Sequence, residues 1–102
     1  MARGVLTDEV KRVSVEQLDY EISRDELRLM PYVQYCIMNT GTIGRTHINR
    51  DENRILNDWE RKGFIQLDSD SQGHDVFFTK KFYQAIYEIL MVGYCSDYII
   101  EE

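Results

Sequence analysis

Five basic and amide side chains in the segment RDENRILNDWERKGFI, residues 50–65, have the chemistry and spacing of a nucleic-acid contact surface. At about 100° per residue, a helix over residues 49–62 places them on one side of its axis, and no acidic residue shares that stripe. An arginine guanidinium pairs with a guanine edge or a phosphate, and an asparagine amide pairs with an adenine edge. The stripe therefore predicts contact with double-stranded DNA, and residues just upstream are candidates for additional backbone contacts. The predicted contact residues are Arg45, His47, Arg50, Asn53, Arg54, Asn57 and Arg61.

The same stripe also fits the solvent face of an ordinary amphipathic helix. Exposed helix faces are normally charged, and Asp58 is positioned to form intrahelical ion pairs with Arg54, Arg61 or Lys62. A net charge of −6 at pH 7 opposes DNA binding by the chain as a whole. Residues 42–62 nevertheless hold five basic and four acidic side chains, whereas residues 1–41, 63–81 and 82–102 are each net negative. Both interpretations stay open.

The elements that position this segment follow from local patterns. The first twenty or so residues mix strand-like alternation with helical spacing; a helix is favoured, and SVEQ at residues 14–17 fits a capping box. Ser23 and Glu26 form a clearer capping box, and they open a helix with Pro31 inside it, which either kinks there or restarts. This helix is expected to be largely buried through Leu27, Met30, Val33, Tyr35, Ile37 and Met38.

Residues 39–49 contain two glycines and no sustained period, which leaves room only for a turn or a short helix. The helix of the basic stripe then starts near Asn49 and ends at Gly63, with Trp59 as the apolar anchor that seats it on the body of the protein. FIQLD and HDVFFT alternate like strands around the turn residues SDSQG and predict a β-hairpin. Thr79 is expected to cap a final helix.

This order of elements, with the pattern L-x-x-W-E-x-x-G-F-I at residues 56–65 and Phe78-Thr79 after the hairpin, resembles the winged helix-turn-helix family of bacterial and phage regulators. The resemblance covers residues 24–92. It implies an α+β fold that is mainly α with a β-hairpin wing, with extra N- and C-terminal helices for dimerisation. The single domain would span residues 1–102, end in an apolar and acidic tail at 93–102, and act in transcriptional control through the helix at 49–62.

Two features depart from the family. The segment between Asn39 and Asn49 is short, so the first helix of the motif is expected to be reduced or absent. The wing carries Asp68, Asp70 and Asp75, where DNA-reading members tend to carry arginine or lysine, and acidic groups beside phosphates weaken binding. These aspartates and the tail instead suit a second function, a non-catalytic protein-interaction module that meets a basic partner.

The C-terminal segment holds more tyrosine than one small core requires. Because amphipathic aromatic residues are enriched at protein interfaces, we expect a homodimer through this segment. The candidate interface residues are Tyr83, Tyr87, Tyr94, Tyr98 and Ile99.

Catalytic and metal-binding patterns are weak. The sequence shows no glycine-rich phosphate loop and no serine elbow, and we expect neither enzyme activity nor a cofactor. Residues 68–73 resemble the start of a calcium loop, but Thr79 stands where the bidentate glutamate belongs, so a plain hairpin turn is favoured and no metal site is expected.

Cys36 and Cys95 fit small core residues rather than a disulfide. Without the apolar core of a signal peptide or a membrane-length apolar run, a cytoplasmic protein is expected.

Overall fold

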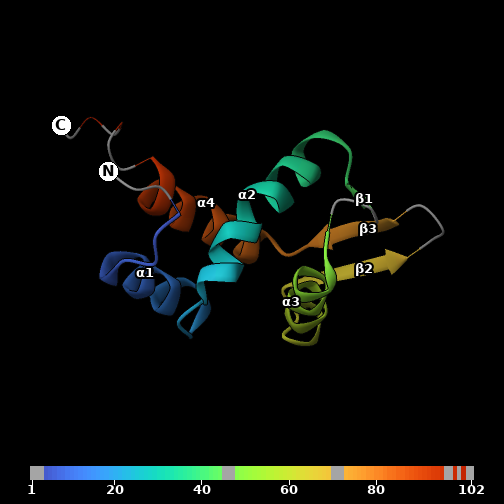
Figure 1. Ribbon diagram of the computed structural model, residues 1–102, viewed down its shortest axis with the longest axis horizontal. Coiled ribbons are helices and arrows are strands. Elements are labelled where there is room, and N and C mark those ends of the chain that lie inside the picture. Colours follow the sequence, from blue (N-terminus) through green and yellow to red (C-terminus); the bar gives the residue numbers. More distant parts are fainter. Residues whose placement is uncertain (1–3, 45–47, 70–72, 96–97, 99, 101–102) are drawn as a thin grey trace.

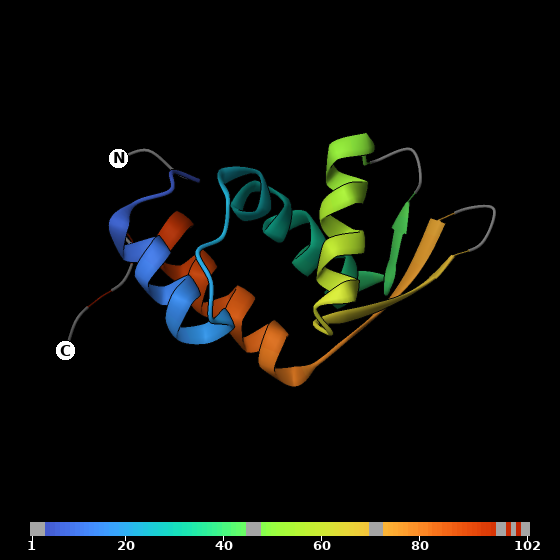
Figure 2. The same ribbon diagram turned by 90° about the horizontal axis from the view of Figure 1, so that it is seen from below.

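Four helices and a small antiparallel sheet make up the computed structural model, which describes residues 4–44, 48–69, 73–95, 98 and 100 (Figure 1). The three strands lie in the order β1-β3-β2. At one end of the molecule α1 packs against α4, and at the other end α3 lies beside the sheet (Figure 2). The elements are α1 (Asp8–Leu18), α2 (Arg24–Asn39), β1 (Thr42–Gly44), α3 (Arg50–Arg61), β2 (Ile65–Ser69), β3 (Gly73–Phe78) and α4 (Lys80–Tyr94). Within the described residues, no helix combines the length and the apolar character needed to cross a membrane.

The first helix forms where a helix was expected, but the predicted capping box at residues 14–17 is wrong. Thr7 caps α1 instead, because its side chain accepts a hydrogen bond from the Val10 amide. Ser14 lies inside the helix and is fully buried. Its hydroxyl donates to the Lys11 carbonyl at 2.8 Å and accepts from the Ile22 amide at 3.3 Å, so the buried hydroxyl is satisfied within the fold.

The second helix confirms its predicted cap and part of its predicted core. Ser23 and Glu26 form the capping box, and α2 runs through Pro31 as one helix. Leu27, Met30 and Val33 are buried as expected. The prediction was wrong for two other residues of this helix: Tyr35 is 62% exposed and Met38 is 69% exposed. At about 100° per residue, both lie about 100° or more around the axis from the buried Val33 and Cys36, so the end of α2 buries only a narrow stripe.

A strand occupies part of the segment where only a turn or short helix was expected. Thr42, Ile43 and Gly44 form β1, which pairs with β3 so that Thr42 lies opposite Asp75. Ile43 is the one large apolar residue of β1, and it is completely buried. A three-residue strand is too short to show an alternating pattern in sequence, so only the tertiary structure reveals it.

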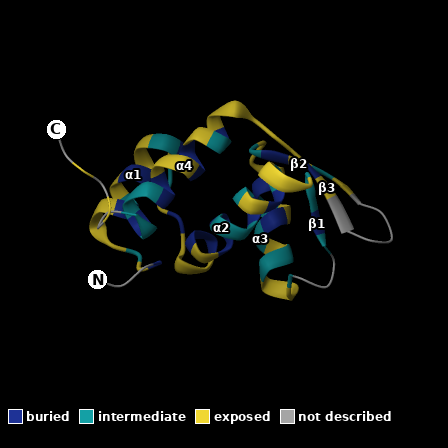
Figure 3. Ribbon diagram, turned by 90° about the horizontal axis from the view of Figure 1, so that it is seen from above, coloured by how far each residue is buried: buried dark blue, intermediate teal, exposed yellow. Residues whose placement is uncertain are grey.

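The predicted hairpin and the predicted anchor are both confirmed. β2 and β3 pair with Leu67 opposite Val76. Trp59 is fully buried, with its ring centroid 5.1 Å from that of Phe82 in an edge-to-face contact. Phe64 stacks on the same Phe82 ring, with the ring centroids 5.0 Å apart. The buried side of each helix thus faces a shared core that continues to the sheet (Figure 3).

Candidate nucleic-acid interface on α3

Helix α3 begins and ends where the sequence predicts. The Asn49 side chain accepts from the Glu52 amide at 2.8 Å, and the Glu52 carboxylate accepts from the Asn49 amide at 2.9 Å. This reciprocal capping box satisfies two amides at the start of the helix. Gly63 follows the helix with φ of +81°, a left-handed conformation that favours glycine, and the next amide returns to the Trp59 carbonyl at 3.0 Å.

A buried carboxylate fixes α3 against α2. Glu26 is 9% exposed, and the indole nitrogen of Trp59 donates to its Oε2 at 2.8 Å. The Tyr20 hydroxyl donates to the same oxygen, and the Ser23 amide donates to Oε1 at 3.0 Å. Three donors compensate the loss of water around the carboxylate. Burial, together with the hydrogen bond to Glu26, raises the pKa of Tyr20 well above its usual value.

Lys62, which follows the last residue of α3, belongs to the same cluster. Its ammonium lies 3.9 Å from the centroid of the Tyr20 ring, while Lys62 Nζ also donates to Asp58 Oδ2 at 2.8 Å. The hydrogen bond from Lys62 holds the pKa of Asp58 below its usual value. Lys62 is therefore engaged in seating the helix and adds less to the outward basic face than its charge suggests.

The outward face of α3 carries a continuous exposed stripe. Arg50, Arg54, Asn57 and Arg61 are all exposed and lie within about 60° of one another around the helix axis. With a rise of about 1.5 Å per residue, Arg50 and Arg61 are separated by about 16 Å along the helix. This length is close to that of four to five base pairs at about 3.4 Å each.

Intrahelical ion pairs, the alternative expected for these arginines, are also present. Arg61 lies 3.3 Å from Asp58, and Arg54 lies 4.0 Å from Asp51 rather than pairing with Asp58. All four side chains of these two pairs are more than a third exposed, and exposed pairs contribute at most about 1 kcal/mol. Both arginines are therefore free to exchange an aspartate for a phosphate oxygen at little cost.

Asn53 departs from the predicted stripe. It is half-buried, and its side-chain oxygen is enclosed without a hydrogen-bond partner among the described residues. On the helical projection it lies only about 60° from the buried Leu56, which places it on the flank of the helix rather than on its outward side. Arg45 and His47, the other predicted contacts, lie outside the described residues.

The hairpin presents acidic groups on its exposed side. Asp68 and Asp75 lie directly opposite each other on β2 and β3, and both are exposed. The Thr42 hydroxyl donates to Asp75 Oδ1 at 2.8 Å. Asp70, the third predicted wing carboxylate, falls outside the described residues.

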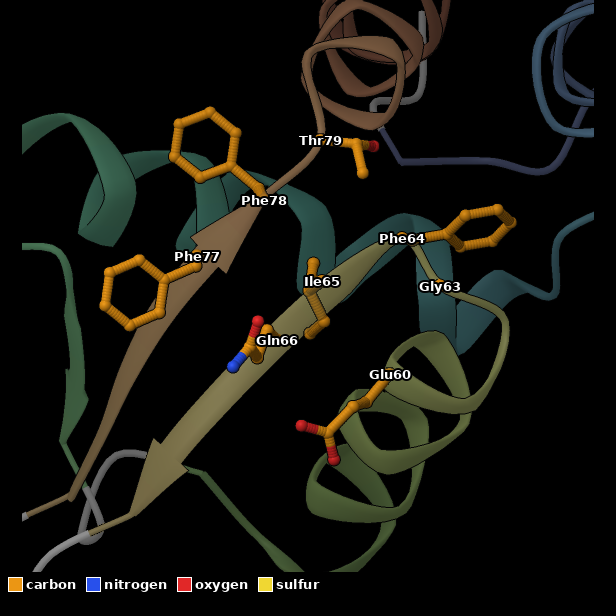
Figure 4. Close-up of a pocket in the computed structure, with 8 residues that line it drawn as sticks. All are labelled: Glu60, Gly63, Phe64, Ile65, Gln66, Phe77, Phe78 and Thr79. Carbon is orange, nitrogen blue, oxygen red and sulfur yellow. The ribbon is translucent and has the colours of Figure 1, made fainter.

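A hollow of about 410 Å³ opens between the end of α3, the start of β2 and the end of β3 (Figure 4). Phe77 and Gln66 project side by side from the two strands, and Glu60 reaches from α3 toward β2. Glu60 Oε2 accepts a hydrogen bond from the Leu67 amide at 2.8 Å. Phe77 is 54% exposed. Phe77 was not among the predicted site residues, although strand alternation in HDVFFT places it on the opposite face from Val76.

The tyrosines predicted to form a dimer interface differ in exposure. Tyr87 and Tyr98 are exposed, whereas Tyr83 and Tyr94 are half-buried. Burial raises the pKa of Tyr94. Ile99 lies outside the described residues, and homodimerisation through this set stays a prediction.

The described residues contain no group of three or more histidine, cysteine, aspartate or glutamate side chains arranged to hold a metal ion. The calcium-like pattern falls partly on residues 70–72, outside the described part of the chain. Cys36 is buried on α2 and Cys95 is half-buried after α4, and both are free thiols.

Comparisons of the chain with protein-family models, with curated proteins and with solved structures found no match.

Proposed function

We propose that this chain is a winged-helix protein that binds double-stranded DNA through the outward face of α3 and acts in transcriptional control. The observation that carries the proposal is the exposed stripe of Arg50, Arg54, Asn57 and Arg61 on the helix that precedes the β-hairpin. Arginine and asparagine are the side chains that pair with base edges and phosphates.

The element order supports the winged-helix assignment. A capped helix, α2, precedes α3; the hairpin of β2 and β3 follows it; and α4 begins immediately after Thr79. This is the order on which the resemblance to winged helix-turn-helix regulators rests. One departure from the family remains: the segment before α3 is short, with only five residues between β1 and α3. A reduced first helix of the motif would leave α3 to be held mainly by Trp59 and the sheet.

Local charge makes DNA contact physically reasonable despite the net charge of −6. The outward stripe contains no carboxylate, and the two aspartates that pair with its arginines lie to one side. Electrostatic attraction falls off over about 8 to 10 Å at ordinary ionic strength. The stripe therefore acts on a nearby phosphate more strongly than do carboxylates that lie farther from that phosphate than this screening length.

Fluorescence anisotropy with a labelled mixed-sequence duplex in 50 mM salt tests this proposal. The triple variant Arg50→Gln, Arg54→Gln, Arg61→Gln is compared with the control Arg12→Gln, Arg24→Gln, Arg28→Gln, which removes three exposed arginines from α1 and α2. The two variants carry the same net charge. We expect the α3 variant to bind at least about 30-fold more weakly and the control to remain within about threefold of the wild type. Equal losses in both variants would overturn the assignment of α3.

The exposed Asp68–Asp75 pair favours a second candidate function, a protein-interaction module for a basic partner. Carboxylates on the hairpin repel phosphates but attract lysine and arginine side chains. This candidate predicts no salt-dependent DNA binding and loss of the protein partner when Asp68 and Asp75 become asparagine.

A further inference from the structure

The sheet has an outer face that no element of the described chain covers with apolar side chains. Directly opposed residues of antiparallel strands point to the same face, so Gln66 and Phe77 share a face with Asp68 and Asp75. Their neighbour Val76 is buried on the inner face. Phe77 is thus a large apolar side chain, 54% exposed, among polar neighbours.

Carboxylates border Phe77 on this face. Asp68 and Asp75 oppose each other across the strands, an arrangement of like charges that destabilises a sheet. Glu60 adds a third carboxylate from α3, because its bond to the Leu67 amide holds it beside the residue that precedes Asp68. Lys62 is close in sequence to Glu60 but pairs with Asp58, and Lys80 and Lys81 begin α4 outside the lining of the hollow. The hairpin side of this face is therefore acidic.

Glu60 also restricts how a partner can approach. β2 is an edge strand, and its Leu67 amide is already bound by Glu60. An added strand could not use that amide, so pairing along the β2 edge is disfavoured. The hollow of about 410 Å³ instead opens beside Phe77 and Gln66, where a side chain from a partner can enter from the outer face (Figure 4).

We propose that the outer sheet face around Phe77 is a docking surface for a protein segment that carries an apolar side chain flanked by lysine or arginine. The apolar side chain packs on Phe77 and enters the hollow, while the flanking cations pair with Asp68, Asp75 and Glu60. The inference deepens the second candidate function and does not depend on DNA binding by α3, because none of the residues that it uses belongs to the arginine stripe.

An NMR titration of the full chain tests the proposal. The probe is the capped peptide Lys-Leu-Lys-Phe-Lys, and its matched control replaces each lysine with glutamate. We expect saturable amide shifts centred on Gln66, Asp68, Asp75 and Phe77 with the basic peptide, and none with the acidic one. Phe77→Ser is expected to weaken binding at least tenfold. The control Tyr35→Ser, which removes an aromatic residue of similar exposure from α2, is expected to leave binding unchanged.

The outcomes separate this inference from the function on which it rests. If Asp68→Asn with Asp75→Asn abolishes binding but Phe77→Ser does not, the acidic interaction function stands and the docking surface around Phe77 is wrong. If the shifts cluster on the α3 acids Asp51 and Asp58 instead, the peptide is held by diffuse charge and the proposal is overturned. If the basic peptide causes no shift even in 20 mM salt, the docking surface and the acidic interaction function both fail.

Discussion

Replacing Tyr20 with phenylalanine is expected to lower the free energy of unfolding by about 1.5 to 3 kcal/mol. The substitution keeps the ring, which stacks on Phe64 and lies under the Lys62 ammonium, and removes only the hydroxyl. That hydroxyl donates to the buried Glu26 carboxylate, and a hydrogen bond to a charged group contributes about 1.5 to 3 kcal/mol. For a chain of this size the corresponding fall in Tm is about 6 to 12 °C.

The assay is urea unfolding of three variants: Tyr20→Phe, Glu26→Gln and the double variant. Tryptophan fluorescence monitors the unfolding. Trp59 is the only tryptophan, and it donates to the same carboxylate, so its emission reports directly on this cluster. Glutamine cannot accept at both positions that Glu26 uses, because one of its two terminal atoms is a donor. The sum of the two single losses of stability is expected to exceed the loss in the double variant by at least about 0.5 kcal/mol, which is the coupling between the two residues.

The matched control is Tyr35→Phe, since Tyr35 is exposed on α2 and its loss of a hydroxyl is expected to change stability by less than about 0.5 kcal/mol. A Tyr20→Phe protein as stable as this control, with no coupling to Glu26, would refute the role of the buried carboxylate in seating α3.

The remaining predictions concern pH and the backbone. Burial raises the pKa of Tyr32 to about 12 and raises those of Tyr20 and Tyr94 above the usual 10.0. The stability that these groups contribute is therefore fully present below about pH 10 and is lost as the pH rises toward 12, which urea unfolding combined with tyrosinate absorbance will detect. Gly63→Ala is expected to cost about 1 to 2 kcal/mol, because φ is +81° and no side chain crowds the site, so the cost is that of the backbone alone. Asp19→Gly is expected to stabilise the chain by up to about 1 kcal/mol, because Asp19 adopts φ of 69° at the end of α1; thermal unfolding measures both changes.

Local chemistry explains which parts of the fold could be predicted from the sequence. The ends of α3 are set by the capping box at Asn49 and by Gly63, and both depend on residues within a few positions of each other. β1 depends instead on pairing with β3, more than 25 residues away in sequence, and its own three residues carry no periodic signal. The cap of α1 is also local, because Thr7 accepts from the Val10 amide, and the helix therefore begins one turn or more before the SVEQ pattern and encloses Ser14.

The candidate site on α3 could also be predicted in part from the sequence. A helical projection finds Arg50, Arg54 and Arg61, because the helix is regular and its buried side is marked by Trp59. The projection misplaced Asn53, since the width of the buried side depends on how the sheet packs against α3. The outer face around Phe77 required the strand register, which no local pattern supplies.

The salt dependence of DNA affinity tests the central claim most directly. If Arg50, Arg54 and Arg61 each neutralise one phosphate, the slope of log K against log salt is about −2.7 for each copy of α3. Affinity for a mixed duplex is then expected to fall about 40-fold between 50 and 200 mM salt in the wild type, and to change little in the variant that lacks the three arginines. An unchanged slope in that variant, or no saturable binding by the wild type at 50 mM salt, would contradict DNA binding through α3.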